Sequence, residues 1–257
     1  MNDLWNDEKI EYVELPDGEL LTDAFIWPDF MQDHLGIDPV KFWNDLLEIP
    51  TWDSETTILF NEKGKDVHWI EGSHKALNYR GHALKRHKIW CQTQYSSGMK
   101  KYGYTGWQHL ISYATKNYRH VPGVKRFADR LNKGLDKKHN HWIITKYKDE
   151  HDNIGFHSDK DRDFEEDSFI VVVKLGAPRQ FEFQFSGQKP FWSKKLDAGT
   201  AVFMKAKNGH DANSLVQHGV PSMKEPIGAS GSIVSRSIET VVPWDVVHKN
   251  VRQRSQK

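Results

Sequence analysis

The chain has 257 residues, 37% of them hydrophobic and 28% charged, which suits one large domain with a sizeable core and a well-solvated surface. The formal net charge is +1 with histidine neutral, so binding of a polyanion would have to come from a local basic patch. A single cysteine excludes an internal disulfide. Because the N-terminus is acidic and no long apolar run occurs, we expect no signal peptide, no membrane-spanning helix and an intracellular monomer of the cytoplasm or nucleus.

The N-terminal part of the sequence predicts a lead-in, a helix and an irregular region. Residues 1–18 are acidic and form the lead-in. In "DPVKFWNDLLEI", Pro39 falls in the first turn, where its missing N–H does no harm. An apolar face then follows at helical spacing: Val40, Trp43, Leu46 and Leu47. Residues 51–110 are aromatic, basic and interrupted by glycines, which favours strands and loops.

A second helix and a series of strands follow. "VPGVKRFADRLNKGL" places an apolar stripe on one face of a helix: Val124, Phe127, Leu131 and Leu135. From about residue 139 the sequence predicts strands joined by short turns: "HWIITKY", "SFIVVVKLG", "QFEFQF", "AGTAVFMKA" and "SIVSRSIETVV". This succession is typical of a β-sandwich or barrel, and a basic tail, "HKNVRQRSQK", comes after it.

The stretch "IGFHSDKDRD", residues 154–163, contains a candidate metal site. A non-haem Fe(II) centre uses two histidines and one carboxylate on one face of the ion and leaves the other face open. His157 and Asp159 would supply two ligands from a strand end, and His218 in "VQHGVP" would supply the third if its strand packs beside them. A solvated turn is the alternative, and it is the interpretation that we keep for Asp152 and Asp163.

Arg236 lies within the apolar strand "SIVSRSIETVV", about 18 residues after His218. An arginine inside an apolar strand is costly unless it is paired. A bound carboxylate is one solution, because the guanidinium fork matches its geometry. The alternative is an arginine on a solvated face, paired with Glu239 or Glu182.

Six segments occur in the same order as in one known family. "HNHWIITKYKDEHDNIGFHSDKD" is followed by "LGAPRQFEF", "VFMKA", "VQHGVP" and "RSIET", and it is preceded by "KRHKIWCQTQYSSGMKKYGYTGWQ". Through this series the chain resembles the AlkB family of Fe(II)/2-oxoglutarate dioxygenases over roughly residues 19–243. The resemblance implies an α+β fold, a double-stranded β-helix (jelly roll) core with N-terminal helices and a nucleotide-recognition lid at about residues 60–110. The dioxygenase domain would cover residues 19–245, followed by a basic tail at 246–257.

The resemblance also implies the cofactors and their ligands. His157, Asp159 and His218 would bind Fe(II), with 2-oxoglutarate as cosubstrate and O2 as oxidant. Arg236 would pair with the distal carboxylate of 2-oxoglutarate, and Tyr147 would hydrogen-bond the same end.

Two positions depart from the family pattern. Thr145 stands where the family has an asparagine that contacts 2-oxoglutarate, and Val242 stands at the second arginine of its R-x-x-x-x-x-R motif. Thr145 can still donate one hydrogen bond, whereas Val242 cannot replace a charge.

The substrate implied by the resemblance is an N-alkylated base in DNA or RNA, single-stranded or flipped out of the duplex. Asp161 would contact the exocyclic amine of that base. The lid would add further substrate-binding side chains: Arg86, Tyr102, Tyr104 and Trp107. Its basic and aromatic residues suit a cationic groove with stacking platforms, and an ordinary solvated surface is the alternative. Hydroxylation of a protein or small molecule, and a catalytically weak nucleic-acid-binding module, stay open as other functions.

Overall fold

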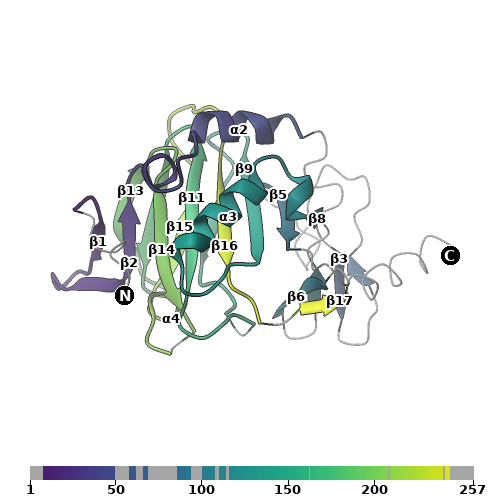
Figure 1. The fold of residues 1–257 in the computed structure, drawn as a ribbon. Helices are drawn as coiled ribbons and strands as arrows, with labels where there is room; N and C mark the ends of the chain where they lie inside the picture. Colours follow the sequence, from purple (N-terminus) through teal and green to yellow (C-terminus); the bar gives the residue numbers. More distant parts are fainter. Residues whose placement is uncertain are drawn as a thin grey trace.

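The protein is described from a computed structural model, which covers residues 8–49, 58–61, 66–68, 86–93, 100–107, 110–113, 116–161, 163–207, 209–239 and 241–243. The expected jelly roll is confirmed. An eight-stranded sheet and a four-stranded sheet pack face to face, and helices cover the outer face of the larger sheet (Figure 1). The described residues also form a third, five-stranded sheet.

The eight-stranded sheet is antiparallel except where its last two strands pair. Its strands, in spatial order, are β1 (Glu11–Glu14), β2 (Leu20–Trp27), β14 (Ala201–Ala206), β11 (Ser168–Gly176), β16 (Ser230–Arg236), β9 (His141–Tyr147), β5 (His87–Gln92) and β8 (Lys116–Asn117). The central strand β11 is buried on both faces. Val171 and Val173 pack toward the helices, and Ile170 and Val172 pack toward the smaller sheet. This explains why its sequence is a continuous apolar run rather than an alternating one.

The four-stranded sheet closes the jelly roll. Its order is β10 (Ile154–His157), β15 (Gln217–Val220), β12 (Arg179–Gln184) and β13 (Pro190–Leu196). Phe181 and Phe183 of β12 face inward and belong to the same hydrophobic cluster as Val172 and Met204 of the larger sheet. The interior between the two sheets is therefore lined by alternate residues of each strand.

Three helices lie on the outer face of the large sheet: α1 (Phe30–Asp33), α2 (Pro39–Leu47) and α3 (Val124–Gly134). Figure 1 shows α3, in teal, crossing in front of β11 and β16. The apolar stripe predicted for α3 is confirmed, since Val124, Phe127 and Leu131 are buried. No helix in the described ranges is both long enough and apolar enough to cross a membrane.

The face predicted for α2 was wrong in two positions. Val40 is 61% exposed and Leu47 is 37% exposed, whereas Phe42 is buried. The buried set, Pro39, Phe42, Trp43 and Leu46, follows the i, i+3, i+4, i+7 pattern from the first helical residue. Asp38 caps the helix by accepting hydrogen bonds from two backbone N–H groups.

The predicted strand "SIVSRSIETVV" was also wrong, because it is two strands in different sheets. β16 ends at Arg236, and β17 (Val241–Pro243) joins the five-stranded sheet, with Val242 opposite Lys101. That sheet has the order β17, β6 (Lys100–Trp107), β7 (Leu110–Tyr113), β3 (Ile58–Asn61) and β4 (Asp66–His68). It takes most of its strands from the expected lid region, but β5 from the same region belongs to the large sheet.

His139 is buried between α3 and β16 and gives a testable acid sensitivity. Its Nδ1 lies 2.7 Å from the Ser235 hydroxyl. Burial, with the charge of Arg236 adding to it, lowers the pKa of His139 from 6.5 to about 3. The folded protein therefore keeps His139 neutral while the unfolded chain binds a proton. His139 alone should lower the free energy of unfolding by about 1.4 kcal/mol for each pH unit of acidification between about pH 6 and about pH 3.

Urea unfolding of the native chain and of His139→Gln across this range measures the effect. We expect the free energy of unfolding to depend less steeply on pH in the variant, by the slope that corresponds to about one bound proton. Parallel curves for the two proteins would contradict the assignment.

Candidate metal centre

The pairing of two strands brings the predicted ligands together. β10 runs antiparallel to β15, and His157 lies directly opposite His218 in the ladder, with ring centroids 4.4 Å apart. Asp159 follows two residues after β10 ends. One ligand atom from each of the three residues lies within 4.8 Å of the others. His218 is thus brought beside His157 because β10 and β15 pair in the small sheet.

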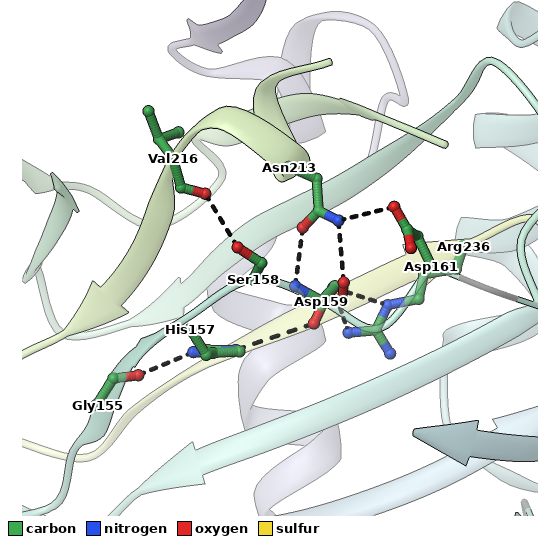
Figure 2. Close-up of polar contacts among 8 residues, drawn as sticks. All are labelled: Gly155, His157, Ser158, Asp159, Asp161, Asn213, Val216 and Arg236. Carbon is green, nitrogen blue, oxygen red and sulfur yellow. Dashed lines mark hydrogen bonds and ion pairs between the residues drawn. The ribbon is translucent and has the colours of Figure 1, made fainter. Parts of the chain in front are cut away.

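The hydrogen bonds of the two imidazoles suit a metal. His157 Nδ1 is 2.8 Å from the carbonyl oxygen of Gly155, so it acts as the donor and leaves Nε2 available (Figure 2). A metal-binding histidine commonly donates its other ring N–H in this way. His218 has a buried Nδ1 without a hydrogen-bond partner. Coordination of a metal by this ring would offset the cost of burying it.

The charges at the site also suit a divalent cation. Burial alone would raise the pKa of Asp159, but Arg236, His218 and His157 together lower it to about 2. Burial lowers the pKa of His218 to about 3 and lowers that of His157 below its usual value. At neutral pH the site therefore presents one carboxylate and two neutral imidazoles, the protonation state that metal binding requires.

Asn213 fixes the loop that carries Asp159. It belongs to the short helix α4 (Ala212–Leu215) and is buried. Its Oδ1 accepts from the Asp159 N–H at 2.8 Å, and its Nδ2 donates to the Asp159 carbonyl at 3.0 Å (Figure 2). The same Nδ2 lies 3.4 Å from Asp161 Oδ2. Asn213 is not among the predicted site residues. The N-cap Asp211 could have located its helix, but nothing in the sequence indicates which loop the helix contacts.

Arg236 lies on the inner face of β16 and binds the predicted metal ligand. Its Nε and Nη2 donate to Asp159 Oδ2 at 3.0 and 2.6 Å. Both side chains are buried, so the solvated pairing with Glu239 or Glu182 that stood as an alternative was wrong. Pairing of Arg236 with the distal carboxylate of 2-oxoglutarate stays a prediction.

Tyr147 and Thr145 are buried on one face of β9. The Arg179 guanidinium lies 4.7 Å from the Tyr147 ring centroid. Burial raises the pKa of Tyr147 to about 12, so its hydroxyl keeps its proton and can donate to an anion. Arg86, which directly precedes β5, is half-buried, and its charge acts on Tyr147 and on His157.

The remaining predicted residues divide into three groups. Asp161 is half-buried beside the metal ligands, in contact with Asn213. Asp152 and Asp163 are buried rather than solvated, so that interpretation was wrong; Asp152 accepts a hydrogen bond from the Lys148 N–H at 2.8 Å. The side chains of three lid residues lie outside the described part of the structure: Tyr102, Tyr104 and Trp107.

Comparison with known proteins gives matches to a family of oxygenases, to proteins named as demethylases and to solved structures. The model of the 2OG-Fe(II) oxygenase superfamily matches residues 49–245. The chain is 26% identical over 198 residues to the DNA oxidative demethylase ALKBH2 of Bos taurus, covering 72% of this chain and 65% of that protein. It is 25% identical over 197 residues to the human protein of the same name, covering 72% and 69%. The solved structure of OsALKBH1 has a TM-score of 0.49 at 12% identity, covering 89% of this chain and 99% of that one.

The superfamily model matches most of the chain. The alignment with the bovine relative spans 65% of that protein, which is less than two thirds of its length. Two neutral imidazoles and one carboxylate on a single face fit the Fe(II) that the superfamily uses with 2-oxoglutarate and O2. The chain therefore belongs to the 2OG-Fe(II) oxygenase superfamily.

Proposed function

We propose that the protein oxidatively demethylates N-alkylated bases in nucleic acid. The observation that carries the proposal is the cross-strand pair of His157 and His218 with Asp159 beside it, in a chain similar to two proteins named DNA oxidative demethylase. Fe(II), 2-oxoglutarate and O2 together supply the chemistry that hydroxylates a C–H bond, with succinate and CO2 as products. A hydroxylated N-methyl group then leaves as formaldehyde.

The residues around the ligands have separate tasks in this proposal. Arg236 compensates the charge of Asp159 and fixes its orientation through two hydrogen bonds. Asn213 holds the backbone of the ligand loop from the opposite side. The hydrogen bonds made by Arg236 and Asn213 do not involve the imidazoles of His157 and His218, so these rings can still bind a metal together with Asp159. The chain thus prepares the site before substrate arrives.

Asp161 is the residue best placed to contact the substrate base. It is half-buried, two residues beyond Asp159, and one of its oxygens is already oriented by Asn213. A carboxylate accepts hydrogen bonds, as recognition of an exocyclic amine requires. The base must be unpaired or flipped out to reach this position, which makes single-stranded DNA or RNA the simplest substrate.

A panel of DNA and RNA oligonucleotides, each with one N-methylated base, tests the proposal. With Fe(II), 2-oxoglutarate and O2, we expect at least one methylated oligonucleotide to yield equal amounts of succinate and formaldehyde. Unmethylated oligonucleotides of the same sequence should yield no formaldehyde. Asp161→Asn should lower this demethylation by roughly tenfold, because one charged hydrogen bond is lost. Succinate formation without formaldehyde from any oligonucleotide would instead favour a protein or small-molecule substrate.

A further inference from the structure

Two cations are buried together inside the jelly roll. Lys174 is 8% exposed on β11, and Arg179 is 1% exposed on β12. Both line one small pocket between the two sheets. Burial, and then the charge of the neighbouring Arg179, lower the pKa of Lys174 to about 7. Two like charges in the interior are unfavourable unless something of opposite charge joins them.

The hydrogen-bond partners of this pair are neutral. Lys174 Nζ donates to the backbone carbonyls of Leu175 and Ala177, which leaves its third donor for a ligand. Arg179 donates to one hydroxyl and four backbone carbonyls: Ser230 Oγ and the oxygens of Asp149, Glu150, Asp152 and Pro221. Its buried Nε has no partner. Among the residues that the structure describes, neither cation forms an ion pair with a carboxylate. Nearby carboxylates, among them Asp197 and Asp152, act on the two cations from beyond ion-pair distance. An anion that contacts both cations directly would therefore be favoured in this pocket.

One wall residue of the pocket contacts a metal ligand, and the two cations line the same pocket. Phe181, in its wall, stacks on the His218 ring with centroids 5.8 Å apart and planes within 8°. Arg179 comes two residues before Phe181 on the same face of β12, a step of about 6.6 Å along a strand. Between these ends the walls are mostly apolar: Val172, Leu196 and Val220. Tyr147 adds a hydroxyl near the cationic end.

The inner face of β16, all of which the structure describes, has no free cation near the pocket, so a cation for an anionic ligand would have to come from another strand. Arg236, at the metal end, is bonded to Asp159. Beyond Val234, toward the cationic end, the same face carries only small side chains, Ser232 and Ser230. Lys174 lies directly opposite Ser232 in the β11–β16 ladder. The long side chain on β11 can therefore occupy the space that the serines on β16 leave open.

We propose that Lys174, with Arg179 and Tyr147 beside it, binds the distal carboxylate of 2-oxoglutarate, while Arg236 serves Asp159. The inference rests on the proposed function, since it assigns residues to the cosubstrate of that reaction. A five-carbon 2-oxo dicarboxylate has the required order of groups: a chelating end for the metal, an apolar middle and a second carboxylate for the cations.

Ligand binding without turnover tests the assignment. Dissociation constants are measured by calorimetry on the Mn(II)-loaded protein for 2-oxoglutarate and for 2-oxopentanoate, which has a methyl group in place of the distal carboxylate. We expect the native protein to prefer 2-oxoglutarate. Lys174→Met should weaken 2-oxoglutarate by roughly tenfold or more and leave 2-oxopentanoate unchanged, because only the charged hydrogen bond is lost. Lys195→Met, at an exposed lysine on β13, is the matched control and should keep the native preference.

Each outcome decides between the alternatives. An unchanged preference in Lys174→Met, or equal weakening of both ligands, would show a structural role for Lys174 and overturn the assignment. Failure of the native protein to bind 2-oxoglutarate at all would overturn the proposed function as well. Lys174→Gln serves as the second variant if Lys174→Met does not fold. Thermal unfolding gives an independent readout, since a given concentration of 2-oxoglutarate should raise the Tm of the native protein more than that of Lys174→Met or Lys174→Gln.

Discussion

Replacing His218 with alanine is expected to abolish succinate formation and to weaken Mn(II) binding by more than about 100-fold. Changes to residues that only support a metal ligand already cost 10–100-fold, so loss of a ligand should exceed that range. His218 is buried, lies opposite His157 in the β10–β15 ladder and stacks on Phe181. Its removal takes one of the three ligand atoms and leaves a site with two.

Electron paramagnetic resonance titration with Mn(II) measures the loss, and circular dichroism shows whether the variant is folded. His120→Ala is the matched control, because His120 is an exposed histidine in the 3-10 turn Tyr118–His120. Native Mn(II) affinity in a folded His218→Ala protein would show that the metal binds elsewhere or not through this residue.

Arg236→Met is expected to destabilise the metal-free protein by about 3–5 kcal/mol. The change keeps an apolar side chain of similar length but leaves Asp159 buried and ionised without its partner, and breaking a buried ion pair has costs of this size. Mn(II) should stabilise the variant more than the native protein, because the ion supplies the missing positive charge. Urea unfolding with and without Mn(II) measures both effects.

A second substitution separates charge from packing. Arg236→Met combined with Asp159→Asn removes the buried negative charge, so the double variant should recover most of the lost stability in the absence of metal. If the single and double variants are equally unstable, the packing of Arg236 against Phe164 would account for the loss instead of the ion pair.

The sequence allows the metal ligands to be predicted because their chemistry is restricted. His157-x-Asp159 at a strand end and His218 before a glycine are side chains that have few other roles in that order. The jelly roll follows from alternating and continuous apolar strands, and Pro39 and Asp38 mark the start of α2. The strands and the start of α2 can be recognised from a few consecutive residues, whereas the assignment of His218 needs the order of segments along the chain.

Two side-chain roles and one strand break could not be predicted, because they depend on contacts between distant strands. Arg236 bonds Asp159, 77 residues away, and the sequence offers several acidic partners of equal plausibility. Lys174 sits in "SFIVVVKLG" as an ordinary lysine near a strand end, and only the fold places it beside Arg179. The break between β16 and β17 is similarly invisible, since Ile238 bridges to Phe164 and continues the apolar pattern.

The two hydrogen bonds between Asn213 and the backbone of Asp159 affect how the protein acquires its metal. Because the amide satisfies both backbone groups of Asp159, the ligand loop is ordered by the fold itself. Ordering the backbone of one residue costs roughly 1–2 kcal/mol, and here that entropy is lost during folding rather than during metal capture. Metal binding therefore does not have to order this residue, and the folded apoprotein already holds the backbone of Asp159 in the position from which it would bind the ion.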